Sequence, residues 1–496
     1  MLKRTRSFLV LVMLLMTVTM SAQVTTATMS GKVTAQDEPI IGATIVAIHE
    51  PSGTRYGTVT NVSGQFNLQG MRTGGPYKVE ISYVGYQTAI YKGINLLLGE
   101  NYVLNVSLKE SSELLDEVVV TASKESNMKS DRAGAIMNAN RDMISNTPTI
   151  SRSISDIMRL SPQGADVGNG FAVGGGNYRQ SFVTVDGAAF NNTFGLGGNL
   201  PANGSPISLD ALEQVTVAVT PFDVRQSGFT GGAINAVTRS GDNQFRGTAY
   251  MYFNNENLKG SKVDDYELLR SKAQYYTYGA SFGGPIIKDK LFFFVNGEYE
   301  DNVTAGSNYR PRTALGESYS GGNIHRPLQS DMDDMRGFLL NKYNFDPGKY
   351  NDYSTDTPAY RVMARVDWNA NQNNKVSFRF TKTHTKDSNF PTSSVSPLST
   401  SALYPGGTST EVIDGKPVGT IAPGQGRTSK YALSFSNSNY YQVRDFTSVA
   451  GEWNSRMAQG AMNNMLRFAY SYQDEPRSCD GPLFPTVDIL QDGAVY

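Results

Sequence analysis

Apolar and polar residues alternate over long stretches in the second half of the chain. Between residues 276 and 283, Tyr276, Tyr278, Ala280 and Phe282 occupy every second position, separated by threonine, glycine and serine. A period of two places successive side chains on opposite faces of a β-strand. The same pattern recurs in Leu291–Glu300, Tyr360–Asn369, Val376–Thr381 and Leu466–Gln473. It predicts long strands, each with one apolar and one polar face.

The connections between these strands differ strongly in length. Residues 285–289 and 369–374 make short connections, whereas residues 302–358 and 385–440 are long and polar. Transmembrane β-barrels have short turns on one side, long loops on the other, and strands of about 9–11 residues. Aromatic residues near the strand ends fit interfacial girdles: Tyr276, Tyr360, Trp368, Trp453 and Tyr472. A soluble all-β protein would show the same alternation, but the lengths favour a barrel.

The first hundred residues carry shorter strands. Residues 30–108 alternate β-prone runs with turn signals, which is typical of a small β-sandwich. Tyr77, Val79, Ile81 and Tyr83 share one face of a strand, and Gly64 marks a turn that needs positive φ. We expect the last strand to run from Tyr102 to Leu108 and His49 to face solvent.

Residues 123–240 are rich in glycine and mix helix with strand. One short helix is expected over residues 153–162, capped by Ser153 or Ser155, with Ile154, Ile157 and Met158 on one face. A strand is expected over 181–187, ending in an Asp-Gly turn. Residues 208–219 are expected to pass from a capped turn into a strand, and residues 231–239 close this part of the chain. The glycines at 168, 170 and 174–176 lack the Lys-Ser/Thr pair of a phosphate-binding loop.

The N-terminus resembles a secretory signal. Basic residues 3–6 precede an apolar run from Phe8 to Met20, too short to span a bilayer, and cleavage is expected after Ala22. No later apolar run reaches 18 residues, so a membrane protein of this sequence would have to be a closed β-barrel. The net charge of −1 argues against a nucleic-acid partner.

The residue types that catalysis or metal binding requires form no recognisable motif. The three histidines, His49, His325 and His384, lie in no triad or metal-binding pattern, so we expect neither an enzyme nor a cofactor. Asp331, Asp333 and Asp334 form an acidic group without the glycine and glutamate of an EF-hand, which favours a solvated patch over a Ca²⁺ site. The single Cys479 has no partner for a disulfide and is interpreted as incidental.

Two stretches resemble known families. Residues 31–34, 39–45, 57–60 with 64–66, and Tyr77 with Gly85 and Tyr86 are similar to the carboxypeptidase regulatory-like domain, which implies an immunoglobulin- or prealbumin-like sandwich without peptidase activity. Residues 178–187, 212–217 and 231–239 resemble the plug of TonB-dependent outer-membrane transporters. The plug residues that this resemblance singles out are Arg179, Asp186, Gly187, Glu213, Arg225, Gly231, Gly232 and Asn235.

The branch of the family follows from two further segments. Residues 190–195 and 221–225, together with the front domain, look most like the Oar-like branch. The SusC-like branch shares the front domain but differs in the plug, so a glycan substrate and a surface lipoprotein partner stay open.

A run of three valines lies between the sandwich and the plug. The resemblance implies that this segment is the TonB box: Asp116, Glu117, Val118, Val119, Val120, Thr121 and Ala122. TonB, with its inner-membrane energising complex, would capture it by strand addition and pull on the plug. The other interpretation is an ordinary buried strand of the preceding domain.

Together these features predict a mainly β protein in five parts. They are a signal peptide (1–22), a sandwich (23–110), the TonB box and linker (111–124), a mixed α/β plug (125–241) and the first strands of a barrel (242–496). About seven strands fall short of the roughly 22 of plugged transporters, so we expect an N-terminal fragment.

The expected function is uptake of an unidentified extracellular ligand across the outer membrane of a Gram-negative bacterium, with outer-membrane lipid around the barrel. A non-transporting adhesion or interaction protein and a secreted β-rich binding protein are the alternatives.

Overall fold

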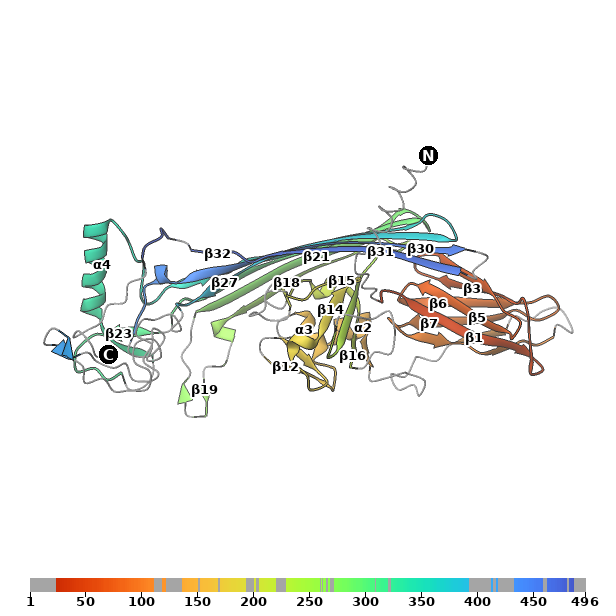
Figure 1. Ribbon diagram of the computed structural model, residues 1–496, viewed down its shortest axis with the longest axis horizontal. Helices are drawn as coiled ribbons and strands as arrows, with labels where there is room; N and C mark the ends of the chain where they lie inside the picture. The colour runs from red at the N-terminus through yellow and green to blue at the C-terminus, as the bar shows by residue number, and fades with distance from the viewer. Residues whose placement is uncertain are drawn as a thin grey trace, which may run out of the picture.

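The computed structural model is mainly β, as predicted, and comprises a sandwich, a plug and a long curved sheet (Figure 1). It describes residues 24–110, 118–121, 136–149, 152–167, 170–192, 200–201, 205–219, 229–258, 260, 262–264, 266–267, 272–307, 309–319, 323–391, 412–413, 416–417, 432–457, 462–479 and 481–485. The predicted signal peptide, Asp116, Glu117, Ala122 and Arg225 lie outside these residues. Among the described helices, none has the length and apolar character needed to cross a membrane.

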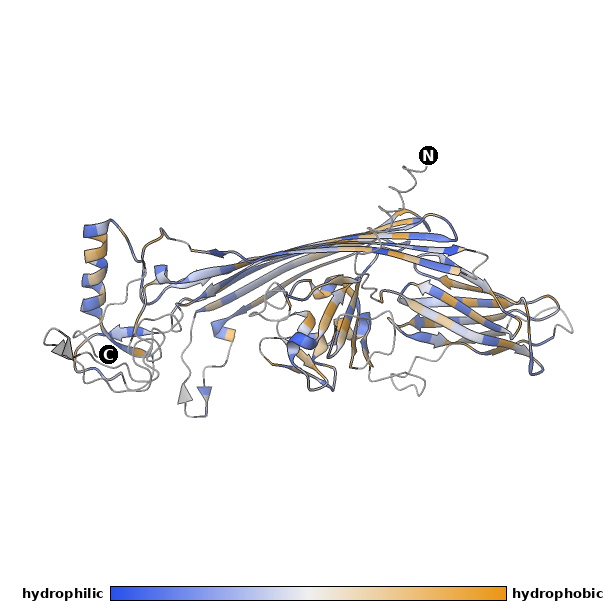
Figure 2. Ribbon diagram, viewed as in Figure 1, coloured by the Kyte–Doolittle hydropathy of each residue, from blue (hydrophilic) through white to orange (hydrophobic). Residues whose placement is uncertain are grey.

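The N-terminal body is a sandwich of two five-stranded sheets. The first contains β1 (Ala27–Ala35), β2 (Glu38–Pro39), β5 (Gln65–Met71), β8 (Asn101–Val103) and β9 (Val106–Ser107). The second has the order β10-β7-β6-β3-β4, built from β10 (Val118–Thr121), β7 (Ala89–Leu96), β6 (Gly74–Ser82), β3 (Thr44–His49) and β4 (Thr54–Val59). Alternating apolar residues of both sheets fill the space between them, including the fully buried Met29, Ile45 and Tyr77. Hydrophobic and hydrophilic residues alternate along the strands of the sandwich (Figure 2).

Two predictions for the sandwich are wrong. His49 is buried, with 6% of its surface exposed, because the period of β3 places it on the same face as Ile45 and Ala47. Its Nδ1 lies 2.7 Å from the hydroxyl of Ser52. The expected strand from Tyr102 to Leu108 is interrupted between β8 and β9, where the side chain of Asn105, instead of a backbone carbonyl, accepts the Lys32 N–H at 3.0 Å.

The plug is built on a five-stranded sheet of order β11-β16-β17-β14-β15. Its strands are β11 (Ile136–Ala139), β16 (Leu212–Ala218), β17 (Ala233–Thr238), β14 (Phe182–Val185) and β15 (Ala188–Ala189), with a hairpin of β12 (Gly164–Asp166) and β13 (Phe171–Val173) beside it. The helices are α2 (Arg141–Asn146), α3 (Ile154–Met158), η1 (Tyr178–Gln180) and η3 (Leu209–Ala211). The predicted short helix is α3, with Ser153 at its N-cap and Ile154, Ile157 and Met158 buried.

The third body is a long antiparallel sheet that curves over the plug (Figure 1). Seven strands follow one another in chain order: β18 (Arg246–Asn255), β21 (Ala273–Ile287), β22 (Leu291–Ala305), β26 (Ala359–Asn369), β27 (Asn374–Asn389), β30 (Tyr440–Met457) and β31 (Met462–Asp474). The predicted alternation is confirmed: Val362, Val366 and Trp368 are exposed on one face of β26, whereas Arg361, Met363 and Arg365 are buried on the other.

The ends of this sheet with long connections carry further elements. They are η4 (Glu256–Leu258), β19 (Lys262–Val263), β20 (Tyr266–Glu267), β23 (Arg310–Arg312), β24 (Ile324–Leu328), α4 (Gln329–Tyr343), β25 (Ser354–Asp356), β28 (Val412–Ile413), β29 (Lys416–Pro417), η5 (Ser436–Ser438) and β32 (Arg477–Ser478). Helix α4 was not predicted, because it has no apolar stripe and Met332 is its one buried residue. The acidic group lies on α4, where Asp333 accepts a hydrogen bond from Tyr350 at 2.6 Å.

Candidate functional site at the plug and barrel wall

The Asp-Gly turn of the plug contacts the long seven-stranded sheet, which we call the barrel wall. It contacts the face of the wall that lies towards the plug, which we call the inner face. Asp186 and Gly187 have φ angles of 51° and 79°, which are the positive angles of a tight two-residue hairpin between β14 and β15. The Asp186 carboxylate accepts hydrogen bonds from the N–H and the hydroxyl of Thr238 at 3.0 and 2.5 Å. The turn therefore fixes a buried negative charge at the surface of the plug.

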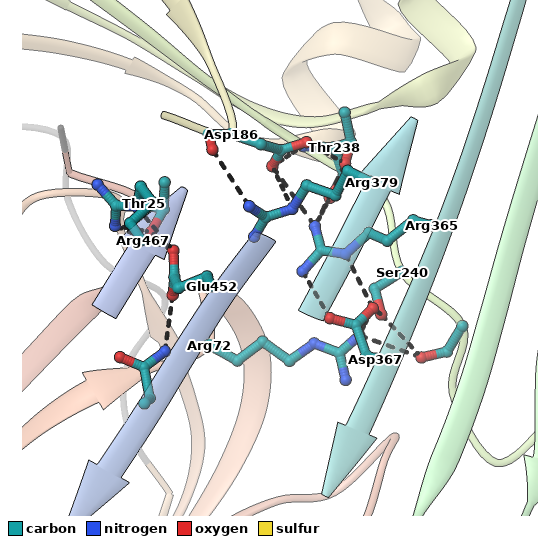
Figure 3. Close-up of polar contacts among 12 residues, drawn as sticks. Thr25, Arg72, Asp186, Thr238, Ser240, Arg365, Asp367, Arg379, Glu452 and Arg467 are labelled. Atoms are coloured by element: carbon teal, nitrogen blue, oxygen red, sulfur yellow. Dashed lines mark hydrogen bonds and ion pairs between the residues drawn. The ribbon is translucent and has the colours of Figure 1, made fainter. Parts of the chain in front are cut away.

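Two barrel arginines face this charge from neighbouring strands. Arg365 on β26 and Arg379 on β27 are direct cross-strand partners, and their nitrogens lie 3.6 and 3.4 Å from Asp186 Oδ1. Like charges placed opposite each other destabilise a sheet. Asp186 supplies the countercharge, so the plug compensates the positive charge of these two arginines in the wall (Figure 3).

The cluster extends from Arg365 towards the sandwich. Arg365 donates two parallel hydrogen bonds to Asp367, at 2.8 and 2.9 Å, and a third to the Thr238 carbonyl at 2.6 Å. Ser240 also donates to Asp367. Arg72 of the sandwich lies 3.9 Å from Asp367 and donates to the Gly241 carbonyl at 3.1 Å. The Asp367 carboxylate thus contacts three parts of the molecule: the barrel strand β26, the last residues of the plug, and the sandwich.

A second ion pair lies on the next two strands. Glu452 on β30 and Arg467 on β31 are cross-strand partners, with nitrogen–oxygen distances of 2.9 and 3.1 Å. Thr25 donates to Glu452 at 2.5 Å, and Arg467 donates to the Thr25 hydroxyl at 2.6 Å. The chain just before β1 is therefore tied to the barrel wall. We call Asp186, Arg365, Asp367, Arg379, Glu452 and Arg467 the ionic cluster.

A third group of contacts joins the plug to the wall further along the strands. Glu298 on β22 accepts hydrogen bonds from Ser208 of the plug at 3.0 Å, from Tyr250 at 2.6 Å and from Arg361 at 3.0 Å. Thr383 donates to the Pro206 carbonyl at 2.6 Å. Ser208, Glu298, Arg361 and Thr383 are buried and Tyr250 is half-buried, so these contacts are largely shielded from competing water.

Apolar contacts link the same surfaces. The hydrophobic core of the plug continues into the wall through Phe294, Met363, Phe446 and Ala450. The rings of Phe190 and Phe446 lie 4.6 Å apart. In the described residues no plug strand pairs with a barrel strand, since the two bodies form separate sheets. Side-chain packing and polar contacts, instead of a continuous backbone ladder, seat the plug.

Glu213 lies where the plug meets the sandwich. It lines a cavity together with Arg72, Arg141, Arg239 and Arg365. Burial raises the pKa of the Glu213 carboxyl, and the positive charges of Arg239, Arg141, Arg72 and Arg365 oppose that shift. In Asp210 nearby, burial also raises the pKa, but hydrogen bonds from Ser281, Thr248 and Arg141 outweigh it and the net pKa is lowered.

The remaining predicted plug residues lie apart from the ionic cluster. A Cβ on Gly232 would come within 2.5 Å of Val173, and Asn235 accepts a hydrogen bond from Thr184 at 2.7 Å inside the sheet. The N–H of Gly231 donates to the Gln180 carbonyl at 3.0 Å. Arg179 is exposed and donates to Tyr178. Of the predicted residues, Asp186 and Gly187 are those at the ionic cluster.

The predicted TonB box is represented by β10. Val118 to Thr121 pair in parallel with Ala89 to Lys92 of β7, at the edge of the second sandwich sheet. The segment is thus extended, as both interpretations of the valine run required.

The barrel side of the cluster was missed in the sequence. The alternation in residues 360–369 and 376–381 predicts only that Arg365, Asp367 and Arg379 lie on the polar faces of their strands, and it does not single out Glu452. The available signal was full charge on the inward face of strands: a buried charge requires a partner, and Asp186 ends the plug strand.

Residues 28–109 match the carboxypeptidase regulatory-like domain, and residues 237–324 match an outer membrane beta barrel domain. The TonB-dependent transporter Oar of Myxococcus xanthus is 27% identical over 256 residues, which cover 50% of this chain and 22% of Oar. The TonB-dependent receptor SusC of Bacteroides thetaiotaomicron is 29% identical over 269 residues, covering 51% of this chain and 24% of SusC.

Among solved structures, the outer membrane transporter YddB from Escherichia coli aligns with a TM-score of 0.46 and 10% identity, covering 70% of this chain and 40% of YddB. The chain spans less than a quarter of the length of the two curated relatives.

Proposed function

We propose that this chain belongs to a TonB-dependent receptor of the outer membrane and takes part in TonB-driven uptake of an extracellular ligand. Its N-terminal carboxypeptidase regulatory-like domain, its match to an outer membrane beta barrel domain and its similarity to Oar support this proposal. The observation that carries the proposal is the seating of the plug. Buried polar contacts and packed side chains hold it against the wall, and such contacts can separate without unravelling a shared sheet.

The route of force starts at the segment around β10. TonB, coupled to its inner-membrane energising complex, would add a strand to residues 116–122 and pull. The pull would reach β11, the first strand of the plug sheet, through residues 122–135. Asp186, Gly187 and Glu213, together with Arg179, Arg225, Gly231, Gly232 and Asn235, would serve the plug by shaping it and holding it in the resting position.

The ligand would be bound at the opposite end of the strands. There α4, β23, β24 and β25 extend the wall into the long connections, and Arg336 pairs with Asp346 at 3.0 Å beside Tyr353 and Asn439. The wall between the two ends would face outer-membrane lipid with its exposed apolar residues.

The test uses the purified periplasmic domain of TonB from the same organism and the full chain in detergent. Val119→Pro removes a backbone N–H that strand addition needs, whereas Val119→Ala keeps it. We expect the proline variant to lose at least tenfold in affinity and the alanine variant to stay within threefold of the parent. Equal affinity of all three proteins would contradict TonB capture at this segment.

The same pair of variants separates uptake from adhesion. If the protein were an outer-membrane adhesion protein without transport, Val118→Pro and Val119→Pro would leave attachment of cells unchanged and no uptake would depend on them.

A further inference from the structure

β10 lies at the edge of the second sandwich sheet, next to β7. β7 pairs with β6 on one side, and its other edge would be open without β10. The pairing runs from Val118↔Ala89 to Thr121↔Lys92. It ends one residue before Gly93, whose φ of 78° breaks the extended backbone of β7. The regulatory-like domain therefore offers four residues of strand edge, and β10 fills them.

The pairing is favoured by the short connection between the partners. Glu110 still belongs to the sandwich through its bridge with Tyr86, and seven residues separate it from Val118. A short tether gives an effective concentration in the millimolar range. The segment is thus held against β7 although the ladder is only four residues long.

β10 uses one of its two edges in this pairing. Within the described residues no other strand pairs with β10, which is the outermost strand of its sheet. An outermost strand presents a row of N–H and C=O groups that a further strand can pair with. A strand that is already extended also loses less conformational freedom when a partner adds to it.

The sandwich is anchored at the end of the barrel with the short turns. Asn369 donates to the Thr54 hydroxyl at 2.9 Å, and the N–H of Asn243 donates to the Pro51 carbonyl at 3.0 Å. Lys375 lies 3.8 Å from the centre of the Tyr56 ring. In a transmembrane barrel this end faces the periplasm, where TonB acts.

We infer that the carboxypeptidase regulatory-like domain is a template for the box: the edge of β7 holds Val118–Thr121 extended and presents the free edge of β10 to the incoming strand of TonB. The inference rests on the proposed function. It assigns the domain a role in partner recognition. If the domain instead hid the segment, docking of β10 on β7 would compete with binding to TonB.

A reversible crosslink separates these roles. In a Cys479→Ser background, Lys92→Cys and Thr121→Cys place cysteines at paired positions, where neighbouring strands put Cα atoms about 4.8 Å apart, within disulfide range. The matched control combines Lys92→Cys with Val119→Cys, two residues out of register and about 8 Å away, which is beyond that range. Crosslinking is followed by gel mobility in isolated outer membranes, and binding of the TonB periplasmic domain is measured before and after reduction.

We expect the paired cysteines to crosslink at least tenfold faster than the control, and the crosslinked protein to bind the TonB domain within threefold of the reduced protein or more tightly. Equal crosslinking rates would overturn the pairing. If the crosslink weakens the affinity for the TonB domain more than threefold and reduction restores it, the domain hides the segment, and the inference that it presents the segment to TonB is overturned. If neither the reduced protein nor the parent binds the TonB domain, the proposed function fails and the inference fails with it.

Discussion

Replacing Asp186 by asparagine tests whether the ionic cluster holds the plug. The Asp186 carboxylate is 3% exposed and faces Arg365 and Arg379 at 3.6 and 3.4 Å. Asparagine tolerates the positive φ of this position and has nearly the same shape, so the variant removes charge with little change of backbone.

The expected loss follows from what stays behind. Removing one partner of a buried ion pair costs about 3–5 kcal/mol, because the other charge is left buried without compensation. Here Asp367 still neutralises Arg365, whereas Arg379 has no other carboxylate at ion-pair distance among the described residues. We therefore expect about 3 kcal/mol, at the lower end, which corresponds to roughly a hundredfold change in an equilibrium constant.

Hydrogen exchange of the plug strands β14 and β17 measures this loss in the detergent-solubilised protein. Their amides should exchange about a hundredfold faster in Asp186→Asn. Asp142→Asn, at an exposed position of the same body, should change exchange less than fivefold. Combining Asp186→Asn with Arg379→Gln should recover part of the loss, since the uncompensated charge is gone. A change below tenfold in Asp186→Asn would refute the role of the cluster in seating the plug.

Three further substitutions test neighbouring features. Gly187→Ala should destabilise the plug by about 1–2 kcal/mol, because φ is 79° and the new Cβ would approach Arg467 at 2.9 Å; faster exchange of β15 measures it. Burial, with a smaller contribution from Arg72, lowers the pKa of His49 to about 3, so its contribution to stability is complete above about pH 6.5 and falls as the pH drops towards 3. The loss is roughly 2 kcal/mol at pH 5, and His49→Gln should remove this pH dependence of exchange in β3. Burial raises the pKa of Glu213, so its ionisation destabilises the folded state as the pH rises through the folded pKa; Glu213→Gln should raise the thermal midpoint more at pH 8 than at pH 4.

The sequence predicted features that depend on local periodicity. Alternation along Tyr360–Asn369 gave strand β26 and its two faces, and the Asp186–Gly187 pair gave a hairpin turn, because both properties are set by a few adjacent residues. The short helix α3 followed from its cap and its three buried apolar residues.

Features that depend on tertiary contacts could not be predicted from the sequence. The alternation of Ile45, Ala47 and His49 places His49 on the inward face of β3, but only the tertiary structure shows what covers it, with Tyr77 packed 5.0 Å away. Arg365 and Asp186 are 179 positions apart in the chain. The sequence therefore gives the charge of each residue but not that the two lie together in the fold. The docking of β10 on β7 likewise depends on a free edge that no single strand reveals.

The cross-strand placement of charge in the barrel wall has a consequence for how the wall is assembled. Alternation of apolar and polar residues rejects a slip of one position between neighbouring strands but accepts a slip of two, which keeps every side chain on its face. Arg365 opposite Arg379, and Glu452 opposite Arg467, do not tolerate the longer slip, since it would carry Arg379 away from Asp186 and Glu452 away from Arg467. The plug therefore selects the strand register: its contacts with the wall form fully only when the strands of the wall have paired in the correct register.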